Sequence, residues 1–116
     1  MNIQELQVAV EYKLPVKVVI LNNGYLGMVR QWQQHFYDNR ESQVLIGAPN
    51  FVKLADAFGM LGMSTNKPSE VEDVLERGFA HPGPVLMEFK IPAFANCYPM
   101  VPPGAPPSKM ILKDPY

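Results

Sequence analysis

The sequence has little of several features that mark particular classes of protein. Its single cysteine, Cys97, cannot form a disulfide within the chain, which fits a reducing compartment. The formal net charge is −1, so no strongly basic surface for nucleic acid or anionic lipid is indicated. The longest apolar run, at residues 18–21, is far shorter than the ~20 residues of a membrane span. These absences predict a cytoplasmic protein that binds neither nucleic acid nor a membrane.

Apolar residues make up 47% of the chain, which is ordinary for a folded protein, and 116 residues suffice for one domain at most. Their spacing predicts helices at residues 3–14, 26–37, 51–58 and 69–80, and strands at 16–21, 60–65 and 85–91. Helices that alternate with strands are typical of α/β proteins, in which right-handed crossovers join parallel strands. We therefore expect an α/β fold with a mostly parallel sheet flanked by helices.

Local signals indicate where several of these elements begin and end. Pro15 is expected to stop the first helix, because proline cannot continue it. Asn50 is expected to cap the third helix, with Gly59 just past its end. Ser69 and Glu72 have the spacing of a capping box, in which each side chain bonds to the other's backbone N–H.

The strand expected at 16–21 and the last part of the chain have contrasting compositions. The strand is β-branched and apolar almost throughout, which predicts that both of its faces are covered. Residues 92–116 hold seven of the twelve prolines and are expected to form an extended tail that wraps another surface. A short extended piece is also expected at 44–46. The chain thus divides into an α/β portion, residues 1–91, and a Pro-rich tail.

The stretch "VILNNGYLGMVRQWQ", residues 19–33, places two amides at the carboxyl end of a strand. Ligands of open α/β sheets bind outside the carboxyl ends of the strands. An amide oxygen is a hard, neutral ligand that suits Mg²⁺ beside a diphosphate, and Gly24 would let the carbonyl of Tyr25 face the same ion. Asn-Gly is also among the commonest turn signals, and from spacing alone a plain turn is the favoured interpretation. The metal site stays open as the alternative.

A family resemblance bears on this choice. The segment "NIQELQVAVEYKLPVKVVILNNGYLGMVRQWQ", at residues 2–33, closely resembles the thiamine-diphosphate-binding domain of acetolactate (acetohydroxyacid) synthase catalytic subunits. The similarity continues through "AFG" at 57–59, "GPVLMEF" at 83–89 and "YPMVPPGA" at 98–105. The paired asparagines are shared by many thiamine-diphosphate enzymes, whereas "LGMVRQWQ" together with "PMVPPGA" is much narrower. On this basis residues 1–91 are expected to be the later part of the cofactor domain.

The resemblance implies a cofactor site around the paired asparagines. It implies that Asn23 gives a side-chain oxygen, and Tyr25 a backbone carbonyl, to a Mg²⁺ that bridges to the diphosphate of thiamine diphosphate. The cofactor-binding stretch comprises Asn23, Gly24, Tyr25, Leu26, Gly27 and Met28. The aspartate of the family's motif precedes the position where this sequence begins, and the activating glutamate comes from another domain of a partner chain. No catalytic residue is therefore expected in this chain.

The resemblance also implies a site for the second substrate and for inhibitors. Trp32 matches the tryptophan that shapes the pocket for the second 2-ketoacid and that contacts herbicide-type inhibitors. Met28 and Val29 match positions on the helix that faces the active site, and Pro103 matches a tail position lining the inhibitor channel. Ordinary core packing is the alternative for the aromatic and apolar side chains on this helix.

The implied activity is the condensation of two 2-ketoacids with loss of CO₂, in valine, leucine and isoleucine biosynthesis. We expect this chain to be a fragment that is inactive by itself; on that interpretation Met1 would be an internal methionine, whereas a true start at Met1 would favour a separate module. The full enzymes carry FAD on another domain, so these residues are not expected to bind it. A homo-oligomer and a regulatory small subunit are the implied partners. The alternatives are another thiamine-diphosphate-dependent decarboxylase or carboligase, and a non-catalytic dimerisation or regulatory α/β module.

Overall fold

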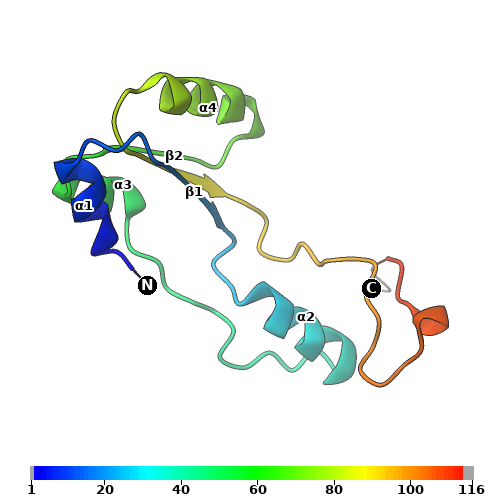
Figure 1. The fold of residues 1–116 in the computed structure, drawn as a ribbon. Helices are drawn as coiled ribbons and strands as arrows, with labels where there is room; N and C mark the ends of the chain where they lie inside the picture. The colour runs from blue at the N-terminus through cyan, green and yellow to red at the C-terminus, as the bar shows by residue number, and fades with distance from the viewer. Residues whose placement is uncertain (1, 114–116) are drawn as a thin grey trace. The chain divides into compact units, whose positions relative to one another are not determined.

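The computed structural model describes residues 2–113. These residues form two compact units, one made of residues 2–23 and 47–91 and the other of residues 24–46 and 92–113. The first unit contains the sheet, and the second contains helix α2 (Gly27–Phe36) and the Pro-rich tail (Figure 1). The chain thus crosses from the first unit to the second directly after the paired asparagines.

The first unit is built on three parallel strands: β1 (Lys17–Asn22), β2 (Leu61–Thr65) and β3 (Val85–Lys90). Their order in the sheet is β1-β3-β2, so that the last strand in the chain is central. The register places Glu88 of β3 between Ile20 of β1 and Ser64 of β2. The expected α/β class with a parallel sheet is therefore confirmed.

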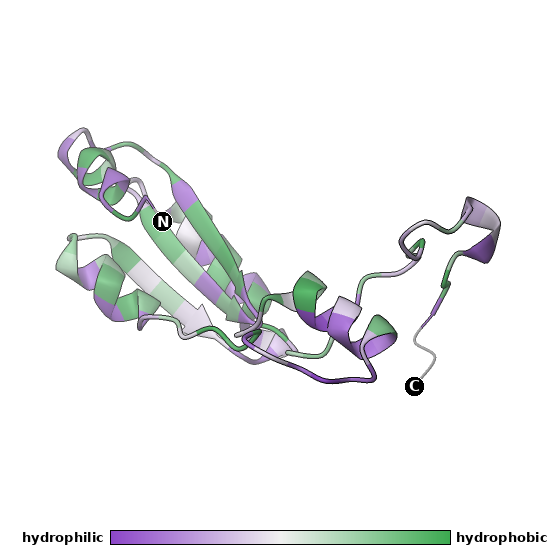
Figure 2. Ribbon diagram, turned by 90° about the horizontal axis from the view of Figure 1, so that it is seen from below, coloured by the Kyte–Doolittle hydropathy of each residue, from purple (hydrophilic) through white to green (hydrophobic). Residues whose placement is uncertain are grey.

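Helices cover both faces of the central strand β3, whose residues are largely apolar (Figure 2). On one face, helix α4 (Val71–Ala80) contributes Val74 to a core with Met63, Val85, Met87 and Phe89. On the other face, helices α1 (Glu5–Glu11) and α3 (Phe51–Ala57) pack against Leu86, and α3 supplies the fully buried Ala55. This alternation along β3 is what a strand buried on both sides requires.

The prediction that both faces of the strand at 16–21 are covered is wrong for β1. Val19 is 45% exposed and Leu21 is 65% exposed. Within residues 2–113, β1 pairs with β3 and with no strand on its outer side. In the parallel register Val19 and Leu21 lie beside Met87 and Phe89, on the face that α4 covers over β3, yet α4 packs mainly on β2 and β3 and leaves these side chains of β1 exposed.

The first helix also ends earlier than predicted, at Glu11 instead of at Leu14. The cause is a Schellman motif in which Lys13 adopts a left-handed conformation with φ of 51°. The N–H of Leu14 donates to the carbonyl of Ala9 at 2.9 Å, and that of Lys13 donates to the carbonyl of Val10 at 3.1 Å. The helix therefore ends four positions before the proline.

The two predicted caps have different outcomes. The Asn50 Oδ1 atom accepts from the backbone N–H of Lys53 at 2.9 Å, and Gly59 follows α3 with a φ of +75°, so both ends of this helix are confirmed. The capping box of Ser69 and Glu72 does not form. Instead a 3₁₀ turn, η1 (Pro68–Glu70), precedes α4, which has no side-chain cap.

The second unit holds α2, within one residue of the predicted helix, together with a loop and the tail. An isolated antiparallel bridge joins Tyr25 to Leu45, so the extended piece expected at 44–46 is present as a single pairing. The tail is largely irregular but contains a 3₁₀ turn, η2 (Pro107–Lys109), and a bridge between Met100 and Ile111. That it wraps another surface stays a prediction, as does the domain boundary after residue 91.

Candidate functional site

Three polar side chains meet at the carboxyl edge of the sheet in the first unit. The Asn22 Nδ2 atom donates to Glu88 Oε1 at 2.6 Å, and the Ser64 hydroxyl donates to Glu88 Oε2 at 2.7 Å. Each residue comes from a different strand, and Glu88, at the centre, is 5% exposed. These side chains lie on the wall of a cavity of about 580 Å³, whose lining residues are Asn22, Ala48, Pro49, Asn50, Val52, Lys53, Ser64, Glu88 and Lys90.

The predicted metal ligand Asn23 directly follows β1 and is half-buried. Gly24 comes next with a φ of +70°, a conformation that glycine adopts without the penalty that a Cβ brings. The stretch is therefore a turn at the carboxyl end of a strand, which is where a ligand residue is also expected. Both interpretations require such a bend, so the choice between a plain turn and a metal site is not decided by it and the metal interpretation stays a prediction.

The two predicted ligand groups of the turn itself, the side-chain amide of Asn23 and the backbone carbonyl of Tyr25, are neutral. Within residues 2–113 no group of three or more His, Cys, Asp or Glu side chains is placed to hold a metal ion. An amide oxygen such as that of Asn23 suits Mg²⁺ when a diphosphate supplies the negative charge. The chemistry of these donors therefore fits a metal that arrives with a diphosphate cofactor.

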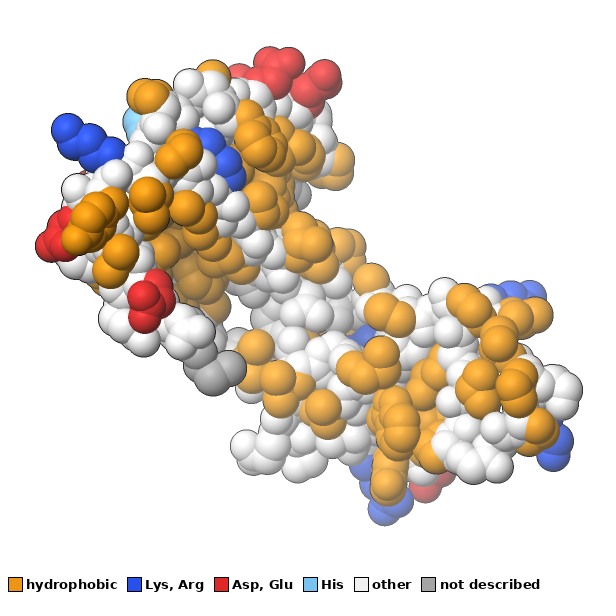
Figure 3. Space-filling view, viewed as in Figure 1, with side chains coloured by type: hydrophobic (Ala, Val, Ile, Leu, Met, Phe, Trp, Pro, Cys, Tyr) orange, Lys and Arg blue, Asp and Glu red, His pale blue; other side chains and the backbone are white. Residues whose placement is uncertain are grey.

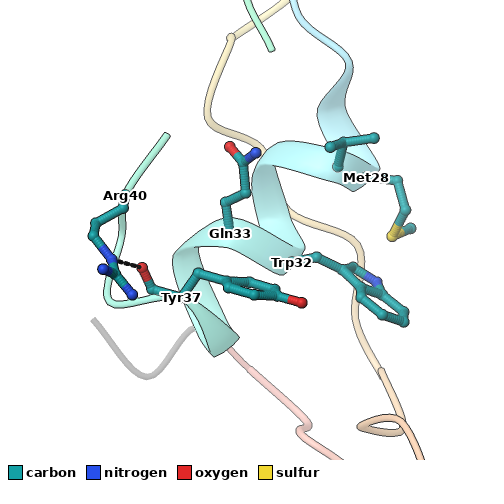
Figure 4. A pocket seen from close by; sticks show the side chains of 6 residues that line it. Met28, Trp32, Gln33, Tyr37 and Arg40 are labelled. Atoms are coloured by element: carbon teal, nitrogen blue, oxygen red, sulfur yellow. Dashed lines mark hydrogen bonds between the residues drawn. The ribbon is translucent and has the colours of Figure 1, made fainter. Parts of the chain in front are cut away.

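A second cavity, of about 660 Å³, lies in the second unit against one side of α2 (Figure 4). Its lining residues are Met28, Val29, Trp32, Gln33, Tyr37 and Arg40. Met28 and Trp32 lie beside each other, and the ring of Tyr37 points toward Trp32. Trp32 is 39% exposed and packs edge-on against Phe36, with ring centroids 5.7 Å apart. Three of the predicted substrate-site residues therefore share one largely apolar cavity.

Pro103, the fourth predicted residue, does not line this cavity. It lies in a turn where the N–H of Ala105 donates to the carbonyl of Pro102 at 3.0 Å and Gly104 has a φ of +72°. These features match a type II turn with proline and glycine at its centre. The predicted role of Pro103 in an inhibitor channel stays a prediction.

Sequence reasoning missed Gln33, Tyr37 and Arg40 as cavity-lining residues. The signal was available for the first two, because residues four apart on a helix share a face and Val29, Gln33 and Tyr37 form such a row. Arg40 had no such signal, because it follows the end of α2. Its Nε atom donates to the carbonyl of Tyr37 at 3.1 Å.

The opposite side of α2 holds the tail through buried polar groups. The amide of Gln31, 1% exposed, donates to the carbonyl of Cys97 at 2.9 Å and accepts from its N–H at 2.8 Å. The guanidinium of Arg30 hydrogen-bonds to Asn96 and stacks over the ring of Phe94 at 5.0 Å. Polar residues 30 and 31 therefore fix the tail, whereas residues 28, 29 and 32 face the cavity.

Comparison with known proteins links these features to a family. Residues 1–89 match the family model described as "Thiamine pyrophosphate enzyme, C-terminal TPP binding domain". The acetolactate synthase large subunit of Porphyra purpurea is 49% identical over 113 residues, which are 96% of this chain and 19% of that protein. The acetolactate synthase isozyme 2 large subunit of Escherichia coli K12 is 43% identical over 114 residues, 97% of this chain and 21% of that protein.

A solved structure supports the same placement. The Rhodococcus jostii thiamine diphosphate-dependent 4-hydroxybenzoylformate decarboxylase is 26% identical, with a TM-score of 0.71 over 83% of this chain and 18% of that one. This chain spans about a fifth of the length of these relatives. No helix within residues 2–113 is long and apolar enough to cross a membrane. The expected resemblance to acetolactate synthase large subunits is confirmed, and the chain belongs to the thiamine pyrophosphate enzyme family, whose C-terminal TPP-binding domain residues 1–89 match.

Proposed function

We propose that this chain forms the later part of the thiamine-diphosphate-binding domain of an acetolactate synthase, and that alone it is inactive. The observation that carries the proposal is the match to acetolactate synthase large subunits, which extends through 96% of the chain, at 49% identity in one relative. The reaction would join pyruvate to a second 2-ketoacid with loss of CO₂, in branched-chain amino-acid biosynthesis. Thiamine diphosphate, when bound, would supply the electron sink for this decarboxylation.

In this proposal Asn23 gives its amide oxygen to Mg²⁺, and the Tyr25 carbonyl is a further ligand from the chain. Leu26 and Gly27 begin α2, so that the stretch from Asn23 to Met28 joins the metal ligands to the substrate helix. Because these protein ligands are neutral, the negative charge of the diphosphate would balance the positive charge of Mg²⁺. The role of these residues is to hold and orient the diphosphate.

The cavity on α2 is proposed to select the second 2-ketoacid. Met28, Val29 and Trp32 give it an apolar wall, which suits the alkyl group of the acceptor. An apolar wall distinguishes 2-ketobutyrate from pyruvate through one methylene, worth ~1–3 kcal/mol. Pro103 is proposed to border the same region in the whole enzyme.

The relatives' name, large subunit, supports a small regulatory partner, and a homo-oligomer in the cytoplasm is proposed with it.

A chimaera tests the proposal. The 114 aligned residues of the Escherichia coli relative are replaced by this chain, and acetolactate formation from pyruvate is assayed with thiamine diphosphate and Mg²⁺. We expect acetolactate from the chimaera and none from this chain assayed alone. Release of acetaldehyde without acetolactate would indicate the decarboxylase alternative instead. A folded chimaera, by circular dichroism, that forms neither product would contradict the proposal.

A further inference from the structure

Glu88 is the one carboxylate that is buried within residues 2–113, with 5% of its surface exposed. It lies in the central strand β3, between Ile20 and Ser64 in the register of the sheet. None of the ion pairs among the described residues includes it. A buried carboxylate without a cation costs free energy through desolvation, and a well-packed apolar side chain at such a site is often neutral or stabilising. Stability by itself therefore does not account for a carboxylate at this position.

The two hydrogen bonds of Glu88 tie the flanking strands to β3. Asn22 of β1 donates to one oxygen at 2.6 Å, and Ser64 of β2 donates to the other at 2.7 Å. Both oxygens of Glu88 accept hydrogen bonds here, and therefore the side chain fixes which way the amide of Asn22 points. The Nδ2 group of Asn22 therefore faces Glu88.

The main chain of Asn22 is held as well. It is aligned with Lys90 in the parallel register, and its carbonyl accepts from the N–H of Ile91 at 3.0 Å. Asn22 is thus the last residue of β1 that is fixed by both its backbone and its side chain. The next residue is Asn23, and Gly24 turns the chain directly after it.

We propose that Glu88 is a positioning residue for Asn23, the amide proposed to bind Mg²⁺ with thiamine diphosphate. By clamping Asn22, its carboxylate sets the direction in which Asn23 leaves the sheet. This inference rests on the proposed function, because the proposed function assigns Mg²⁺ to Asn23. Metal ligands lose affinity when the residues that orient them are removed, even though those residues do not touch the metal.

Three substitutions separate this role from a structural one. Glu88→Met keeps the length of the side chain and removes both hydrogen bonds. Glu88→Gln can accept from Asn22 with its oxygen and donate to the hydroxyl of Ser64 with its nitrogen, so it is the conservative rescue. Ser64→Ala is the matched control, because it removes one bond to the same carboxylate but leaves the clamp on Asn22 in place.

The first readout needs no cofactor. With ¹⁵N-labelled chain, NMR follows the side-chain amide of Asn22 and the hydrogen exchange of the Asn23 backbone N–H. We expect Glu88→Met to shift the Asn22 amide resonance and to speed the exchange at Asn23 about tenfold, whereas Glu88→Gln and Ser64→Ala stay within about twofold of the wild type. Exchange at Asn23 that is unchanged in Glu88→Met would overturn the proposal.

The second readout is the binding of Mg²⁺ and thiamine diphosphate, measured by titration calorimetry on the chimaera described above. We expect Glu88→Met to raise the dissociation constant for Mg²⁺ at least about tenfold, as is typical for a residue that orients a metal ligand, without lowering the melting temperature. Loss of folding in Glu88→Met that Glu88→Gln does not rescue would overturn the positioning role. If the wild-type chimaera binds no Mg²⁺, the proposed function fails. The hydrogen exchange of the Asn23 backbone N–H then decides by itself whether Glu88 positions Asn23.

Discussion

At the scale of single residues, Gly62 is packed closely against the backbone of α3. A Cβ at this position would lie 2.7 Å from the Cβ of Ala55, 3.0 Å from the carbonyl oxygen of Val52 and 3.1 Å from its Cα. Two of these atoms belong to the backbone of α3, so they cannot move without the helix. Gly62 therefore sets the distance between α3 and β2.

We expect Gly62→Ala to lower the free energy of unfolding by ~1–3 kcal/mol, because α3 must move away from the sheet. Gly47→Ala is the matched control, since a Cβ there would have no atom within 4 Å. The control should remain within ~0.5 kcal/mol of the wild type. Urea unfolding of the three proteins measures the difference, and equal midpoints for both variants would contradict this account of Gly62.

Trp32 offers a prediction about specificity. Replacing it by leucine in the chimaera removes most of the aromatic wall beside Met28 and Val29. The acceptor that gains most from an apolar wall is the longer one, so we expect Trp32→Leu to lower the preference for 2-ketobutyrate over pyruvate by ~10-fold or more. Competition between the two acceptors, with both products quantified, gives this ratio.

The stability of the same variant is the check on this interpretation. Trp32 is 39% exposed, so its replacement should not unfold the protein. An unchanged product ratio in a folded Trp32→Leu chimaera would mean that Trp32 merely packs against Phe36. The sequence by itself could not decide between these roles, because a helical row of apolar residues is the same for a core face and for the wall of a cavity.

Residues that act through tertiary contacts were the hardest to predict. Gln31 and Arg30 are buried because the tail, more than sixty residues further along the chain, lies against them. Nothing in their immediate neighbours indicates this. Glu88 is similar: the sequence places it in a strand, but its partners Asn22 and Ser64 come from two other strands. The strand order that unites them is a property of the fold.

At the scale of elements, the start of α4 shows how a local signal can be overridden. The spacing of Ser69 and Glu72 indicated a capping box, yet Pro68 opens a 3₁₀ turn there. Glu70 then bonds to side chains outside the helix: Thr65 Oγ1 donates to it at 2.6 Å and Lys67 Nζ donates at 2.6 Å. In contrast, α3 was predicted at both ends, since Asn50 and Gly59 act through neighbours in the sequence.

The bonds of Glu70 make the junction of β2 and α4 sensitive to pH. The hydrogen bond from Lys67, followed by that from Thr65, holds the pKa of the Glu70 carboxyl below its usual 4.5. A carboxyl whose pKa is lowered on folding contributes stability above its unfolded pKa and loses it as the pH falls through the folded pKa. The same pair raises the pKa of Lys67 above 10.5, so its contribution is complete below that pH and is lost as the pH rises further.

We therefore expect Glu70→Gln to lower the melting temperature at pH 7, with a difference from the wild type that disappears as the pH falls below about 4.5. The effect should be modest, because these groups are open to solvent. Asp73→Asn is the control: it breaks the exposed pair with Arg77 inside α4 without touching β2. Thermal melts from pH 3 to pH 8 test this, and a difference that persists at pH 3 would contradict it.

At the scale of the whole molecule, the sequence predicted the α/β class and the parallel direction of the strands but not the exposure of β1. A β-branched, apolar strand is typical of the interior of a sheet, and β1 has that composition. Among the described residues, however, it is an edge strand. The apolar composition of β1 suits a strand that is covered on both faces. It therefore favours a partner surface over β1 in solution.

The exposed apolar surface is substantial in the first unit. Apolar side chains gather over the part that holds α1 in the view of Figure 3. A cavity of about 700 Å³ lies between α1, β1 and α3, with Val18, Ile20 and Leu86 in its wall. An apolar surface beside an open strand edge favours pairing with another chain.

We expect this chain to self-associate in solution through β1. Charges on exposed positions of an edge strand oppose such pairing, so the double variant Val19→Lys with Leu21→Lys should be more monomeric than the wild type. Leu112→Lys is the control, because Leu112 is 73% exposed but lies in the tail. Sedimentation velocity at several concentrations should show larger species for the wild type and for Leu112→Lys alone. A wild type that sediments as a monomer at every concentration would show that the exposed face of β1 needs no cover, and the apolar composition of this strand would then need another explanation.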